Sequence, residues 1–108
     1  MELILIPVFG DRISPRLDFA QSMQLIKIEN QKIANRETIK IITQNRLDRI
    51  NKIINLAPDV IICDGLTEMC KSELQKANIK VIPWVHGEIE KILKMYLEKK
   101  LNKKIAAK

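Results

Sequence analysis

The chain has 108 residues, of which 46% are hydrophobic and 4% aromatic. This is the length of one domain with an aliphatic core, and its apolar runs are far shorter than the roughly 20 residues that a membrane-spanning helix needs. The formal net charge of +6 comes from residues 91–108, which hold seven Lys and one Glu, because residues 1–90 hold 12 basic and 12 acidic side chains.

We therefore expect a single domain over residues 1–100 and a basic tail over residues 101–108, with no membrane partner. The tail is expected to be solvated rather than bound to nucleic acid, because no aromatic residues alternate with its lysines. Two cysteines without a signal peptide indicate the reducing cytoplasm. For the same reason Cys63 and Cys70 are not expected to form a disulfide.

An unbroken apolar run predicts a first strand over residues 3–8, buried on both faces. The loop after it contains Pro7, Gly10 and Pro15, and five charged or hydroxyl side chains between residues 11 and 18. Because proline restricts φ and glycine permits positive φ, this loop is expected to have a defined shape. A shaped loop at the end of a central strand is a common ligand site in α/β proteins.

Alternating apolar residues predict two strands over residues 23–29 and 32–42, joined by a tight turn at Asn30 and Gln31. From residue 45 the apolar period becomes helical, which predicts a helix over residues 45–57. The inner face of this helix is expected to carry Leu47, Ile50, Ile53, Ile54 and Ala57, with Pro58 ending the helix.

A short apolar strand is predicted over residues 60–63, followed by a helix over residues 67–77 with Thr67 as its N-cap. Asn78 is expected to end that helix in the left-handed conformation. A strand over residues 79–82 and a last helix over residues 88–100 complete the pattern.

The element order is β-β-β-α-β-α-β-α, which predicts a three-layer ribonuclease H-like α/β fold with a mixed sheet. The first, fourth and fifth strands then run parallel, so the loops after them, at residues 7–20, 63–67 and 83–87, converge at one edge of the sheet. Open α/β sheets bind ligands at this edge.

The expected ligand is an anion, because two helix N-termini point toward this edge and basic side chains lie beside them. Glycines in the turns would let the ligand approach the backbone. The residues expected to bind it are Gly10, Arg12, Arg16, Asp18, Gly65, Thr67 and Gly87.

Cys63 and His86 are the candidate metal ligands at the same edge. Two ligands do not complete a metal site, so the sulfides of a cluster or a dimer partner would supply the others. The alternatives are that Cys63 is a core residue and that His86 caps the last helix. Cys70 is expected in the core, and Trp84 either closes the core, lines a dimer face or roofs the ligand site.

Three segments carry a resemblance to a known family: residues 6–20 (IPVFGDRISPRLDFA), 60–65 (VIICDG) and 79–88 (IKVIPWVHGE). Together they resemble the dinitrogenase iron-molybdenum cofactor biosynthesis family, with its NifX-type carriers and NifB C-terminal regions. The resemblance covers roughly residues 2–98 and implies the same fold. The loop of NifX-type carriers usually contains a His-Phe-Gly element before an alanine; by the shared alanine, Ala20 here, the histidine falls at Arg16.

The resemblance implies a non-enzymatic carrier of an anionic iron–sulfur or iron-molybdenum type cluster, with a cluster-donor or acceptor protein as partner. Arg16 would then neutralise an anionic cluster. One alternative is a regulatory or scaffold module that acts through its surface and basic tail. Another is a metal-dependent nuclease, which is not favoured because the first strand carries no acid and only Asp64 is well placed.

Overall fold

The computed structural model describes residues 1–98, and the predicted tail and the last two residues of the predicted helix 88–100 lie outside them. Its strands are β1 (Glu2–Phe9), β2 (Arg12–Ile13), β3 (Ser22–Glu29), β4 (Lys32–Lys40), β5 (Val60–Ile62) and β6 (Lys80–Ile82). Its helices are the short 3-10 helix η1 (Leu17–Phe19), α1 (Arg46–Asn55), α2 (Glu68–Lys76) and α3 (Ile89–Leu97). None of the helices within residues 1–98 is long and apolar enough to cross a membrane.

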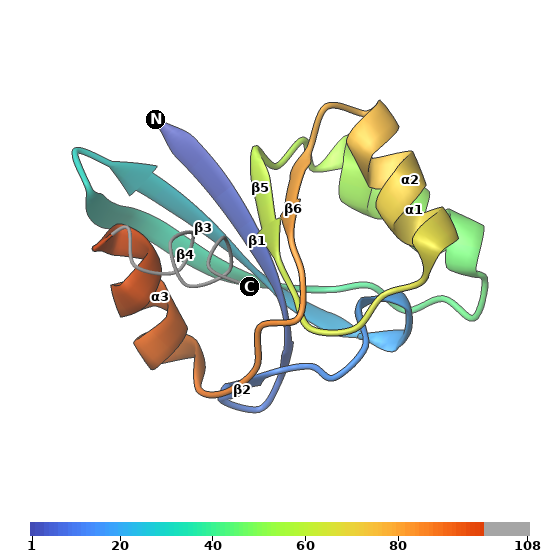
Figure 1. Ribbon diagram of the computed structural model, residues 1–108, viewed down its shortest axis with the longest axis horizontal. Helices are drawn as coiled ribbons and strands as arrows, with labels where there is room; N and C mark the ends of the chain where they lie inside the picture. Colours follow the sequence, from blue (N-terminus) through green and yellow to red (C-terminus); the bar gives the residue numbers. More distant parts are fainter. Residues whose placement is uncertain (99–108) are drawn as a thin grey trace.

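The sheet is the middle of three layers, with α1 and α2 on one face and α3 on the other (Figure 1). Successive residues of β1 serve the two faces in turn: Ile4 and Ile6 belong to the core under α3, and Leu5 to the core under α1 and α2. Strand side chains alternate between faces, so a central strand covered on both sides must be apolar throughout. The predicted three-layer α/β class is confirmed.

The strand order is β4-β3-β1-β5-β6, with β2 attached to the end of β1. β1, β5 and β6 are parallel neighbours, whereas β3 and β4 pair antiparallel. The carboxyl ends of the three parallel strands therefore lie at one edge, as predicted. The expected strands and helices are present with ends shifted by a few residues; β2 and η1, inside the loop after β1, were not predicted.

Left-handed residues sit at three of the predicted turns. Asn30 and Gln31 have φ values of 52° and 62°, as a two-residue hairpin of type I′ requires. Asn78 has a φ of 64° after α2, which confirms its predicted role. Ala57 takes the matching position after α1, with a φ of 54°.

The predicted inner face of α1 was wrong at both ends. Leu47 is 55% exposed, whereas Arg49 is 4% exposed, and Ala57 is exposed beyond the last turn. Arg49 lies inward because its guanidinium finds carbonyl partners in neighbouring segments, which apolar spacing alone does not reveal.

Candidate functional site

The three loops at the carboxyl edge are joined directly through their backbones. Leu17 donates its N–H to the Gly65 carbonyl and Gly65 donates to the Pro15 carbonyl, both at 2.9 Å. Ile13 donates to the Gly87 carbonyl at 3.0 Å, and Ile89 donates to the Asp11 carbonyl at 3.0 Å. The loops converge as predicted, and these main-chain hydrogen bonds join them to one another.

The glycines at this edge allow close packing between the loops and backbone conformations with positive φ. A Cβ on Gly65 would lie 3.0 Å from the Pro15 carbonyl oxygen and 3.2 Å from the Arg16 Cδ, so this glycine makes room for the neighbouring loop. Gly10 has a φ of +65° in the two-residue turn between β1 and β2, and Gly87 has a φ of +118°. Both backbones are in the region that glycine adopts without strain.

The two helix N-termini are partly used by the protein. The Thr67 hydroxyl accepts a hydrogen bond from the Cys70 N–H at 3.1 Å, which confirms Thr67 as the N-cap of α2. At α3, the N–H of Ile89 is taken by Asp11. Some of the N–H groups at these helix N-termini, which were expected to face an anion, are therefore already hydrogen-bonded within the protein.

Open space lies on the other side of the first loop. A cleft of about 500 Å³ is bounded by the ends of β1 and β3 and by η1. It is lined by Val8, Phe9, Gly10, Ser14, Phe19, Ala20, Gln21 and Ser22. Its two aromatic walls, Phe9 and Phe19, are 78% and 53% exposed. We call this space the edge cleft.

A group of charged residues surrounds one of these walls. The Arg16 guanidinium donates from Nε and Nη2 to the Asp18 carboxylate at 3.2 and 3.1 Å. The guanidinium carbons of Arg16 and Arg46 lie 5.3 and 5.0 Å from the centroid of the Phe19 ring. Such distances are within the range of cation–π attraction. Arg16, Asp18, Phe19 and Arg46 are called the arginine–phenylalanine cluster below.

Arg46 and Phe19 were missed by the sequence analysis. Arg46 is the first residue of α1, and it reaches the site only because the start of α1 packs against η1. No spacing rule connects residues so far apart in the chain. The signal in the sequence that could have indicated Phe19 was its position, as an aromatic residue beside a run of charged side chains.

The two predicted metal ligands occupy different environments. Cys63 is fully buried in the core under α1 and α2, and burial raises the pKa of its thiol to about 12. His86 is exposed. Among residues 1–98, no group of three or more His, Cys, Asp or Glu side chains is placed to hold a metal ion. Cys70 is buried, as predicted, and burial raises its thiol pKa to about 11.

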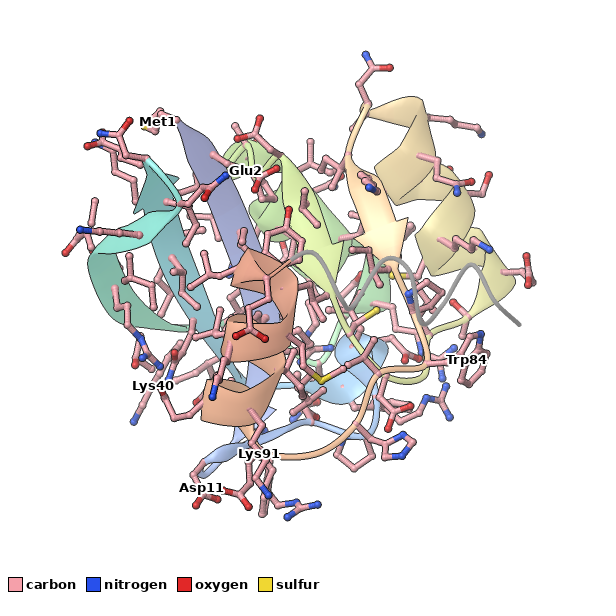
Figure 2. All side chains as sticks on the ribbon, turned by 60° about the vertical axis from the view of Figure 1, so that its left-hand side comes forward. Met1, Glu2, Asp11, Lys40, Trp84 and Lys91 are labelled. Carbon is pink, nitrogen blue, oxygen red and sulfur yellow. The ribbon has the colours of Figure 1, made fainter. Side chains whose placement is uncertain are left out.

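The prediction that Trp84 closes the core was wrong, because the residue is 65% exposed. Its backbone has a φ of 64° and donates its N–H to the Asp64 carbonyl at 3.1 Å. The indole projects from the surface at the periphery of the molecule (Figure 2). The other two predicted roles, at a dimer face or over a ligand, stay predictions.

A second cleft, of about 430 Å³, lies at the opposite end of β1 from Asp11. It is lined by Met1, Glu2, Ile28, Asn30, Gln31, Tyr96 and Leu97. The Tyr96 hydroxyl donates to the Glu2 carboxylate at 2.7 Å, and burial followed by this hydrogen bond raises the Tyr96 pKa. None of the predicted site residues lies there.

No protein-family model matches the chain. An uncharacterized protein of Methanocaldococcus jannaschii, MJ0580, is 26% identical over 105 residues, which cover 93% of this chain and 89% of that protein.

Solved structures with the same architecture are more distant in sequence. The crystal structure of PH0822 superposes with a TM-score of 0.85 at 19% identity, covering 91% of this chain and 90% of the other. A candidate dinitrogenase of M. jannaschii, MJ0327, gives 0.76 at 16% identity, with coverages of 92% and 90%. A candidate NifB protein of Thermotoga gives 0.73 at 16% identity, with coverages of 93% and 90%. These likenesses establish that the chain has the fold of those proteins.

Proposed function

We propose that the protein is a non-enzymatic carrier or accessory protein of the dinitrogenase cofactor type. Its cargo would be an anionic metal–sulfur cluster, held at the carboxyl edge of the sheet beside the edge cleft. The fold shared with a candidate dinitrogenase and a candidate NifB protein supports this role. The resemblance of the loop residues 6–20 to that family supports it independently.

The arginine–phenylalanine cluster is the observation that carries the proposal. Two guanidinium groups meet at one exposed aromatic ring, and that ring is also a wall of the edge cleft. Asp18 offsets the charge of Arg16, whereas Arg46 makes no ion pair within residues 1–98. Arg46 would therefore supply most of the net attraction for an anion.

Binding through charge rather than thiolate follows from the state of Cys63. A buried thiol with a pKa near 12 is protonated at neutral pH, and a metal ligand must be a thiolate. His86 is exposed and would provide at most one bond to the cargo.

The test is an anaerobic titration of the apo protein with tetrathiomolybdate, a compact metal–sulfide dianion, and in parallel with an isolated iron–sulfur cluster. Variants Arg46→Gln and Arg16→Ala should weaken binding, with the larger loss for Arg46→Gln, and raised salt should weaken it further. His86→Ala and Cys63→Ala should have smaller effects. Arg36→Gln, which removes a charge on the α3 side of the sheet, is the matched control.

Absence of binding in the wild type, or equal binding by all the variants, would contradict the proposal. The surface-scaffold alternative would then be the better account. A loss confined to Cys63→Ala or His86→Ala would instead indicate direct metal coordination.

A further inference from the structure

A buried arginine, Arg49, contacts the arginine–phenylalanine cluster through the backbone of Asp18. Arg49 is 4% exposed, and none of the ion pairs within residues 1–98 involves it. Its Nε is buried and has no hydrogen-bond partner in the described part of the chain. A buried guanidinium without a carboxylate is costly, because burial removes the hydration of its charge. Departures of this kind from ordinary core composition are concentrated at functional sites.

The other two nitrogens of Arg49 hold two separate segments of backbone. Nη1 donates to the Asp18 carbonyl in η1 at 2.6 Å, and Nη2 donates to the Thr43 carbonyl before α1 at 2.7 Å. The segment before α1 is itself ordered, since the Asn45 N–H donates to the Thr43 hydroxyl at 3.1 Å. Arg49 thus connects the start of α1 to the loop that carries Phe19.

Arg49 and Arg46 act on the same loop from one side of the helix. Residues three apart on a helix are neighbours on its surface. Arg46, in the first turn, contacts the Phe19 ring, and Arg49, one turn later, holds the carbonyl of the preceding residue, Asp18. The Asp18 side chain meanwhile binds Arg16. Asp18 is therefore fixed through both its backbone and its carboxylate, with Phe19 next to it.

From this arrangement we infer that Arg49 is the positioning residue of the anion site. Its hydrogen bond to the Asp18 carbonyl holds η1 against α1, and its bond to the Thr43 carbonyl holds the segment before α1. Together they bring Arg16 and Arg46 to the same aromatic ring. Arg49 does not itself touch the cargo. The inference rests on the proposed function for the identity of the bound anion, but the positioning itself is a property of the apo protein.

The variants are Arg49→Met, which keeps an unbranched side chain but removes the guanidinium and its donors, and Arg49→Lys, which keeps the charge but lacks the planar fork that reaches two carbonyls. Ile28→Ala is the matched control, because Ile28 is 7% exposed in the other core, under α3, and its truncation also lowers stability. All are compared with the wild-type chain by thermal melting.

Two readouts separate positioning from general stability. In the apo protein, nuclear Overhauser contacts between the Phe19 ring and the side chains of Arg16 and Arg46 should be lost in Arg49→Met and weakened in Arg49→Lys. They should persist in Ile28→Ala. Tetrathiomolybdate affinity should fall about tenfold in Arg49→Met, comparable to the loss of an outer-shell support at a metal site.

Ring contacts that persist in Arg49→Met, or that are lost equally in Ile28→Ala, would overturn the inference. If Arg49→Met does not fold, Arg49→Lys decides by the same ring contacts. If the wild type does not bind tetrathiomolybdate, the proposed function fails, while the ring contacts still decide the role of Arg49.

Discussion

Asp18 is a buried carboxylate whose hydrogen-bonded partner is a half-exposed arginine. Its side chain is 1% exposed, whereas that of Arg16 is 48% exposed. The pair orients the Arg16 guanidinium against Phe19, but it also cancels the charge that an anionic ligand would experience. Asp18 therefore sets both the geometry and the strength of the arginine–phenylalanine cluster.

Replacing Asp18 by asparagine should increase the affinity for tetrathiomolybdate, because Arg16 then keeps its full charge. The increase should be greatest at low salt, and stability should fall by about 1–3 kcal/mol as a buried ionic hydrogen bond is lost. Asp11→Asn is the control, since it removes an exposed carboxylate from the same edge without touching Arg16. Unchanged or weaker binding by Asp18→Asn would show that Arg16 does not meet the anion.

Ala57 has a backbone conformation that is unusual for an alanine. It occupies the left-handed position after α1 that Asn78 occupies after α2. A residue with a Cβ pays roughly 1–2 kcal/mol for that conformation. Ala57 is exposed, so its methyl group provides little packing in return.

We expect Ala57→Gly to stabilise the protein by roughly 1 kcal/mol, which corresponds to a rise in Tm of about 4–8 °C. Ala77→Gly is the matched control, because the φ of Ala77 is −85° and glycine relieves no strain there. It should leave Tm unchanged or lower it. A lower Tm for Ala57→Gly would mean that the helix end is not held as described.

At the level of elements, α3 is joined to the edge strand β4 by a two-pronged ion pair. Arg36 donates to Glu90 from both terminal nitrogens, at 3.0 and 2.8 Å. The hydrogen bond from Arg36 lowers the pKa of Glu90 below its ordinary 4.5. The folded state therefore holds this carboxylate charged at a pH where the unfolded chain begins to protonate it.

The contribution of this pair should be fully present above the ordinary pKa of Glu90 and be lost as the pH falls through the lowered value. The stability difference between wild type and Glu90→Gln should thus be constant near neutral pH and vanish in acid. It should be below about 1 kcal/mol, because the pair is exposed, and smaller in high salt. Glu37→Gln is the matched control, because Glu37 lies on the same strand as Arg36 and takes part in none of the ion pairs within residues 1–98.

The helices and longer strands could be predicted from the sequence, whereas the candidate site could be predicted only in part. The apolar run of β1 and the helical spacing of α2 reflect local rules, so both were found. β2 and η1 depend on hydrogen bonds from Ile13 to Gly87 and from Leu17 to Gly65, which no local pattern encodes. Arg46 and Arg49 depend in the same way on a loop distant in sequence. The convergence of the loops at this edge was predicted from the sequence, whereas the main-chain bonds between them and the cleft on the other side of the first loop were not.

At the scale of the whole molecule, the charge is unevenly divided, since the excess of +6 resides in residues 91–108. We expect removal of residues 102–108 to leave Tm nearly unchanged, because the apolar stripe of the last predicted helix thins after Leu101. Melting curves of the full and shortened chains in matched buffer check this. A fall of more than about 5 °C, roughly 1 kcal/mol for a domain of this size, would contradict it.

The main-chain bonds between the loops have a consequence for how this fold can diversify. The bonds between Pro15, Leu17 and Gly65 use only N–H and C=O groups, which are common to nearly all residue types. The shape of the loop is therefore largely independent of the side chain at position 16. Proteins only 16–19% identical to this one keep the same architecture. The side chains presented at this edge can therefore change during evolution while the main-chain scaffold beneath them stays the same.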